Sequence, residues 1–206
     1  MYIGDKPKSK EWKKLLDTNS TIQRYSITWG EKYLKYGDWL WCPRDSKFFE
    51  EPKILFVRLR NKSLSRKLIG MLDNDKYYNR DNFNNIIIKD ARYSLAYILG
   101  LFNSNLLNYW YKSYFDNVNI NPAQVRLLPY PKINFSDSAD KSRHDHIVKL
   151  VEQMLSAKEK LASAKLESEK DRLELLCQSL DRQIDEAVYE LYDLTAEEIK
   201  VVEGEK

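Results

Sequence analysis

The chain has 206 residues, of which 43% are hydrophobic and 13% aromatic, so its composition excludes general disorder and predicts a folded protein. It contains no run of eighteen apolar residues, and its first residues lack the apolar centre of a signal peptide; we therefore expect a cytoplasmic protein with no membrane partner. Only two cysteines occur, Cys42 and Cys177, which argues against a disulfide framework or a zinc ribbon.

Charge divides the chain into two parts. Residues 1–140 hold 23 Lys and Arg against 15 Asp and Glu, which gives +8, whereas residues 141–206 hold 11 against 16, which gives −5. Of the 26 Phe, Trp and Tyr residues, all but Tyr189 and Tyr192 lie in the basic part. A basic, aromatic part followed by an acidic one suggests a ligand-facing domain carried on a second domain.

The basic part has the pattern of a small sheet followed by helix. Short apolar or β-branched runs at 53–60, 67–72 and 84–90 are bounded by Asn, Asp, Ser and Pro, which is typical of strands. Residues 93–115 have the length and apolar spacing of one helix or two packed on that sheet. We predict an α+β fold whose sheet is small and mostly antiparallel.

Two prolines mark the end of this part. Pro129 and Pro131 fix their own backbone angles and push the residues before them towards extended conformations, so no helix can run through. We therefore predict a first domain at 1–135 and a helical domain at 136–206.

The acidic part has the three-and-four spacing of amphipathic helices. One apolar stripe runs from Ile147 to Leu161 and a second from Leu173 to Leu191, and the polar stretch 167–172 separates them. Two helices folded into a hairpin, or one long coiled-coil rod, both fit this pattern. We expect the seam to contain one set of apolar residues: Leu150, Met154, Leu161, Leu176, Leu180 and Ile184.

Two local signals accompany these helices. Thr195 and Glu198 form a capping box that predicts a short last helix. His144 and His146 stand two apart at a polar helix start, so they would point in different directions, and we expect solvated caps rather than a metal pair.

The sequence lacks the common catalytic motifs. It has no glycine-rich nucleotide loop, no zinc-protease HExxH and no GxSxG, which indicates that this chain is not an enzyme by itself.

The remaining functional signal is positive charge mixed with amides and aromatics in three stretches, 58–67, 73–83 and 113–126. Arg and Lys can bond guanine O6 and N7, Asn and Gln can bridge adenine, and cations hold phosphates. The candidate DNA-binding residues are Arg58, Arg60, Lys62, Arg66, Lys67, Tyr78, Asn79, Arg80, Asn119, Asn121, Gln124 and Arg126. Asn119, Asn121, Gln124 and Arg126 are the predicted base readers, and Lys62, Arg66 and Lys67 the predicted phosphate holders. The alternative is that Asn119 and Asn121 only supply turn hydrogen bonds beside Pro122.

Several segments resemble one known family: WGEKYLKYGDWLW, EPKILFVRLRN, ILGLFNSNLLNYWY, the LPYP step and the ending IDEAVYELYDLTAEEI. From about Tyr25 to Glu203 the chain is similar to the C-terminal specificity domain of TaqI-like, type IIG restriction-modification enzymes and adenine DNA methyltransferases. Type I specificity subunits share a recognition domain that closes on a Leu-Pro-x-Pro step before a long helix.

The resemblance implies a DNA target recognition domain followed by a helical spacer. It places S-adenosylmethionine and catalysis in a methyltransferase domain whose motifs this chain lacks, so we expect a C-terminal fragment of a larger enzyme, with double-stranded DNA and that domain as its partners. The alternative is a helical scaffold or protein-interaction module of a restriction-modification or other defence complex, without direct base reading.

Overall fold

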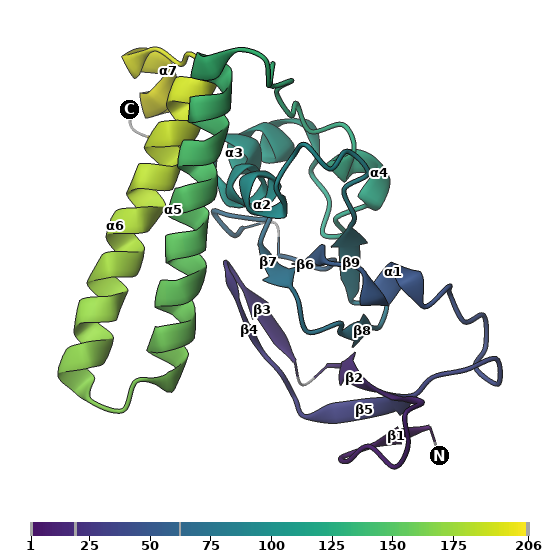
Figure 1. The fold of residues 1–206 in the computed structure, drawn as a ribbon. Coiled ribbons are helices and arrows are strands. Elements are labelled where there is room, and N and C mark those ends of the chain that lie inside the picture. The colour runs from purple at the N-terminus through teal and green to yellow at the C-terminus, as the bar shows by residue number, and fades with distance from the viewer. Residues whose placement is uncertain (1, 19, 62, 205–206) are drawn as a thin grey trace.

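The computed structural model describes residues 2–18, 20–61 and 63–204. Small sheets lie on one side of the molecule, two long helices lie on the other, and helices α2 (Leu95–Asn103) and α3 (Asn105–Tyr114) stand between them (Figure 1). This arrangement confirms the predicted α+β class. No helix within the described ranges is both long and apolar enough to cross a membrane.

The central sheet has the strand order β7-β6-β9 and is antiparallel throughout. Its strands are β6 (Lys53–Val57), β7 (Gly70–Asp73) and β9 (Phe83–Ile86), so all three predicted strands exist but each is shorter than expected. The sequence predicted β6 to reach residue 60. The chain leaves the sheet earlier because residues 58–60 bond to residues 118–120 instead.

The N-terminal region forms strands that the sequence analysis did not predict. A four-stranded sheet has the order β1-β5-β2-β8, made of β1 (Ile3–Gly4), β2 (Trp12–Leu16), β5 (Lys32–Lys35) and β8 (Tyr78–Asn79), and β2 pairs with β8 in parallel. A hairpin of β3 (Thr21–Gln23) and β4 (Ser26–Thr28) follows β2, and the short helix α1 (Lys47–Glu50) precedes β6. These strands are only two to five residues long, and the two longest, β2 and β5, hold two lysines each, so they lack the apolar alternation that predicts strands.

Two buried asparagines join the helices to the outer edge of β7 and to the residues just before it. The Asn103 amide accepts from Gly70 N at 2.7 Å and donates to Gly70 O at 3.0 Å, and Asn108 makes the same pair of bonds to the backbone of Leu68. An edge strand otherwise leaves its backbone groups unpaired. The two side chains therefore complete the sheet from the helical layer.

The long helices α5 (Ser138–Ser163) and α6 (Glu167–Leu191) fold back on each other, which confirms the hairpin and shows that the single rod is wrong (Figure 1). The break lies at residues 164–166, whereas the sequence placed it at 167–172; those residues form the exposed first turn of α6. The capping box is confirmed, because Thr195 and Glu198 bond reciprocally at the start of α7 (Ala196–Glu203).

The hairpin seam agrees with the prediction except at one position. Leu150, Met154, Leu180 and Ile184 are buried, and Leu161 is partly buried. Leu176 is 45% exposed, so its assignment to the seam was wrong. The buried face of α6 instead runs through Leu173, Cys177, Leu180 and Ile184. Leu176 precedes Cys177 and therefore lies about 100° away around the helix, outside this face.

The expectation of two solvated histidines was also partly wrong. His146 is exposed, but His144 is only 4% exposed and packs among aromatic rings, with its ring centroid 4.5 Å from that of Tyr97 and 5.2 Å from that of Phe135. Its Nε2 accepts from Ser94 N at 3.4 Å. His144 therefore helps dock the start of α5 onto the start of α2.

The two predicted domains share one hydrophobic core. Buried residues of β6, α2 and α3 pack in the same cluster as those of α5 and α6. Helix α2 comes so near α5 at Gly100 that a Cβ there would stand 2.9 Å from Val151 and 3.0 Å from Ile147. The change of sequence character after the Pro-x-Pro step thus coincides with a change of layer within a continuous core. The division into domains at 1–135 and 136–206 stays a prediction.

Candidate nucleic-acid interface

The three stretches selected from the sequence lie side by side. Arg58 N donates to Asn82 O at 3.0 Å, Arg60 N donates to Val118 O at 3.0 Å, and Ile120 N donates to Arg58 O at 2.7 Å. The described residues 58–61, 80–82 and 116–119 therefore form one surface, which we call the recognition ridge.

Arg58 stands at the centre of the ridge and is held in place by its neighbours. Its Nε donates to Asn119 Oδ1 at 3.0 Å, and its Nη1 donates to Asp81 O at 3.3 Å. These two bonds orient the guanidinium. Because it has five N–H donors, others remain for a ligand. A positioned, half-buried arginine is the group that bonds guanine O6 and N7.

The ridge also exposes apolar and basic side chains around Arg58. Leu59 is 58% exposed and Val118 is 46% exposed, and Arg80 is exposed at the turn between β8 and β9. Apolar groups of this kind can contact the methyl group of thymine, while exposed arginines can bond bases or phosphates. The ridge thus combines the types of side chain that contact base edges in DNA.

The predicted base readers differ in what they do. Asn119 orients Arg58 and so supports the ridge. Asn121 caps the short helix α4 (Pro122–Val125), with Oδ1 accepting from Ala123 N at 2.9 Å, and Gln124 Oε1 accepts from Tyr111 Oη at 2.8 Å and from Asn117 Nδ2 at 3.2 Å. Arg126 is exposed but lines a different cleft, beside β9. Asn121 and Gln124 therefore hold the loop in shape, as the alternative interpretation of Asn121 had it.

Three further candidates do not lie free on the surface. Lys67 is 2% exposed, and its Nζ donates to Asn117 O at 2.6 Å. Tyr78 is 1% exposed and donates to Glu50 at 2.7 Å; burial raises its pKa. Asn79 is half-buried and bonds the backbone of Arg80 and Phe83, which fixes the turn carrying Arg80. Lys62 lies outside the described residues.

Arg66, a predicted phosphate holder, is ion-paired with the helical hairpin instead. Its Nη2 lies 3.0 Å from Asp185 Oδ2 and 3.5 Å from Asp181 Oδ2, and Nη1 donates to Asn103 O at 2.8 Å. Burial raises the pKa of the Asp185 carboxyl, although Arg66 and the backbone N–H of Asn105 act to lower it. Arg66 therefore ties the β6–β7 loop to α6.

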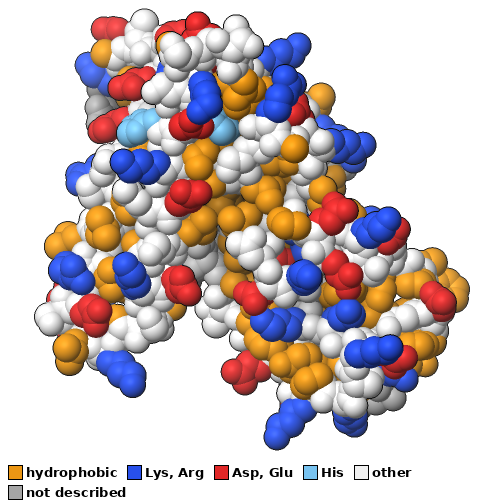
Figure 2. All heavy atoms as spheres, viewed as in Figure 1, with side chains coloured by type: hydrophobic (Ala, Val, Ile, Leu, Met, Phe, Trp, Pro, Cys, Tyr) orange, Lys and Arg blue, Asp and Glu red, His pale blue; other side chains and the backbone are white. Residues whose placement is uncertain are grey.

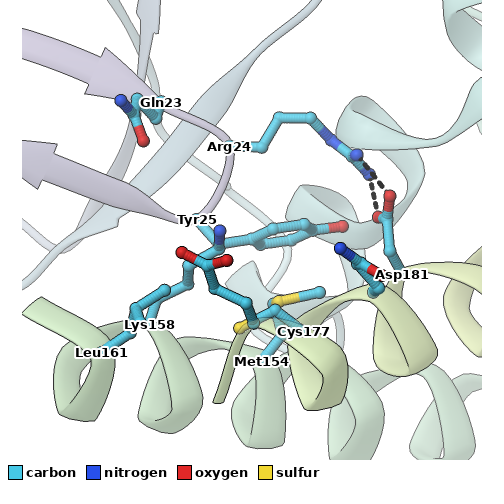
Figure 3. A pocket seen from close by; sticks show the side chains of 10 residues that line it. Gln23, Arg24, Tyr25, Met154, Lys158, Leu161, Cys177 and Asp181 are labelled. Carbon is cyan, nitrogen blue, oxygen red and sulfur yellow. Dashed lines mark hydrogen bonds and ion pairs between the residues drawn. The ribbon is translucent and has the colours of Figure 1, made fainter. Parts of the chain in front are cut away.

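A crevice next to this ion pair lies between the β3–β4 turn and the hairpin (Figure 3). There Arg24 forms two bonds to the Asp181 carboxylate, one of them 2.7 Å long between Nη1 and Oδ2. Lys158 lines the crevice from α5. Figure 2 shows the molecule hollowed between the free end of the hairpin and the sheets, with basic and acidic side chains mixed along both sides.

Arg60 is a half-buried cation of this region that makes no ion pair with a described carboxylate. Its Nη2 donates to Arg66 O at 3.0 Å, while its Nε is buried and has no hydrogen-bond partner among the described residues. Burial lowers the pKa of Arg60. Because an uncompensated, partly buried cation is costly, an anion placed here would stabilise it.

The sequence analysis missed Arg24 and Lys158 as neighbours of these loops. Arg24 lies in a hairpin that no pattern predicted, and Lys158 belongs to a helix interpreted as scaffold. Only the fold places them beside Arg60 and Arg66.

A family model, the TaqI-like C-terminal specificity domain, matches residues 13–129, which is more than half of the chain. The chain belongs to this family. A search of curated proteins finds no match. The TaqI-like match ends at Pro129, the first proline of the Pro-x-Pro step, and covers all three stretches that build the ridge. It supports a DNA-recognition domain of a restriction-modification enzyme, as the resemblance implied.

Proposed function

We propose that this chain recognises a specific sequence in duplex DNA through the recognition ridge and so positions a methyltransferase domain on its target. One observation carries the proposal: three loops that are separate in the sequence converge on a single oriented guanidinium, that of Arg58. The family match supports the same conclusion.

The residues divide into two roles. Arg58 and Arg80 contact base edges, because one is oriented and the other exposed at the same surface. Arg60 and Lys158 contact phosphates along the crevice at the flank of the ridge, where Arg24 and Arg66 are already neutralised by Asp181 and Asp185. Methyl transfer and S-adenosylmethionine belong to the partner domain, and this chain contributes recognition without catalysis.

A second candidate, a protein-interaction module, is favoured by one observation. Leu166 is 67% exposed in the turn between α5 and α6, and Leu175 is 66% exposed on α6. Exposed leucines on the hairpin suit a protein contact if a partner covers them. This function does not require the ridge, so variants of the ridge separate the two candidates.

The test is binding of the full chain to a fluorescein-labelled duplex, measured by anisotropy over a range of KCl concentrations. We expect the affinity to fall steeply with salt, with a slope of about 0.9 per phosphate contacted. Lys158→Gln should reduce that slope by about one, whereas Arg92→Gln, which removes an exposed arginine paired with Asp90 before α2, should leave it unchanged. An affinity that does not respond to salt, or equal effects of the two variants, would count against the proposal.

A further inference from the structure

A mostly apolar cleft of about 480 Å³ lies beside the end of β9, away from the recognition ridge. Figure 1 shows α4 beyond this end of the strand and α1 beside the strand. The apolar lining of the cleft comes from α1, β6, the end of β9 with the residues after it, α2, and the segment from α4 to the Pro-x-Pro step, and it includes Phe48, Ile87, Val125 and Tyr130.

The open edge of β9 faces away from β6. In an antiparallel ladder, bonded pairs alternate, and the bond from Arg58 N to Asn82 O shows that residues 82, 84 and 86 direct their backbone groups towards β6. The backbone groups of Asn85 and Ile87 therefore point outward. No hydrogen bond from a described residue reaches them.

Two side-chain atoms in the cleft also lack hydrogen-bond partners among the described residues. Asn85 Oδ1 and Tyr130 Oη are buried, and neither has a hydrogen-bond partner among residues 2–18, 20–61 and 63–204. Burial raises the pKa of the Tyr130 hydroxyl, so it stays protonated and able to donate. An apolar cleft with a few placed polar groups is the usual composition of a binding site.

The charged residues at the rim of the cleft are all basic. Lys89 and Arg126 are exposed at the cleft, neither has an ion pair with a described residue, and none of the residues that line the cleft is acidic. The phosphates of a nucleic acid would satisfy the two cations, but the sugar-phosphate backbone offers no apolar side groups that would fill the cleft. An extended polypeptide with apolar side chains and a carboxylate would satisfy both.

We propose that this cleft binds an extended, acidic and apolar segment of a partner protein, which adds to the open edge of β9 as a further strand. Its backbone bonds to Asn85 and Ile87, its alternate side chains fill the space between α1 and α4, and its carboxylates meet Lys89 and Arg126. This binding surface is separate from the recognition ridge and does not depend on DNA recognition.

The test begins with a phage-displayed library of random twelve-residue peptides selected on the full chain. The expected result is enrichment of sequences that alternate β-branched with acidic residues. These peptides should bind at least tenfold more weakly to Ile87→Pro, which removes the outward N–H, and to Arg126→Glu. Lys132→Glu, which changes an exposed lysine outside the cleft by the same charge, should bind as the unmodified chain does. Amide chemical shifts of Asn85 and Ile87 should change on binding.

Failure to enrich any peptide that distinguishes the chain from Arg126→Glu would overturn the proposal. So would loss of duplex DNA binding in Arg126→Glu as large as the loss in Arg58→Gln, because the cleft would then belong to the DNA surface. A melting curve for each variant shows whether it is folded, and the Arg126→Glu arm stands if Ile87→Pro does not fold.

Discussion

Arg24 in the β3–β4 turn and Asp181 in α6 are 157 positions apart in the sequence, yet the guanidinium and the carboxylate meet through two parallel bonds. The exposed fraction of the two side chains is 19% and 26%. This contact joins the N-terminal hairpin to the helical hairpin, and Arg66 reaches the same carboxylate from the β6–β7 loop. One aspartate, shared by two arginines, therefore holds both the β3–β4 turn and the β6–β7 loop against α6.

The first prediction concerns that pair. In a double-mutant cycle of Arg24→Met and Asp181→Asn, we expect a coupling free energy of about 1–3 kcal/mol, because the pair is bidentate and mostly shielded from solvent. The same cycle on Lys141 and Asp145, an exposed pair within one helix, should give less than about 0.5 kcal/mol. Urea unfolding measures both, and equal couplings would mean that the Arg24 contact contributes no more than a surface ion pair.

The second prediction concerns the asparagine that completes the sheet. Asn103→Ala leaves the buried Gly70 N–H without its acceptor, and we expect a loss of about 2–4 kcal/mol in the free energy of unfolding. Tyr25 N still donates to Gly70 O at 3.0 Å, so the carbonyl keeps a partner. Asn103→Asp should cost more, since it buries a carboxylate beside that carbonyl. Thermal or urea unfolding that is unchanged in both variants would contradict this role.

The third prediction compares two leucines four positions apart on α6. Leu180→Asp places a charge in the buried seam and should cost about 3–5 kcal/mol, whereas Leu176→Asp changes an exposed position and should alter stability by about 0.5 kcal/mol or less. Circular dichroism melting of the two variants measures the difference. Similar melting temperatures would show that the seam is drawn on the wrong face.

The fourth prediction uses the buried thiol of the seam. Burial raises the pKa of Cys177, so its thiolate is scarce at neutral pH and the sulfur is shielded. In a Cys42→Ser background, which removes the exposed thiol, we expect Ellman's reagent to react with the native chain far more slowly than with the unfolded chain. Arg24→Met should accelerate labelling, because it loosens the crevice next to Cys177. Labelling of the native chain as fast as that of the unfolded chain would rule out a closed hairpin.

The sequence predicted the parts whose signal is local. The apolar spacing of 147–161 and 173–191, the strands within 53–90 and the Thr195 capping box each depend on residues close together in the chain, and all appear in the structure. No local sequence pattern of this kind predicts the N-terminal strands. Lys13 and Lys14 occupy consecutive positions of β2 and are balanced by Glu50 and Asp75, which are distant in the sequence.

The site shows the same limit. Composition selected the three stretches, but neither their convergence nor the state of each cation could be predicted from it. Lys67 is buried against Asn117, and Arg66 pairs with a carboxylate 119 positions away, so neither could be distinguished from Arg60 or Arg80 by residue type. Long-range partners decide which arginines and lysines remain free for a ligand.

The central claim is that Arg58, oriented by Asn119, contacts a base within a specific duplex sequence. The most direct measurement is selection of a randomised duplex on the full chain and, in parallel, on Arg58→Ala and on Arg92→Ala. We predict that the unmodified chain and Arg92→Ala select the same preferred sequence. In Arg58→Ala the preference for guanine should be relaxed at a single position, and the binding free energy for the selected site should weaken by about 1–3 kcal/mol. If the folded Arg58→Ala variant keeps the same preference at every position, the recognition ridge is not the surface that contacts the bases.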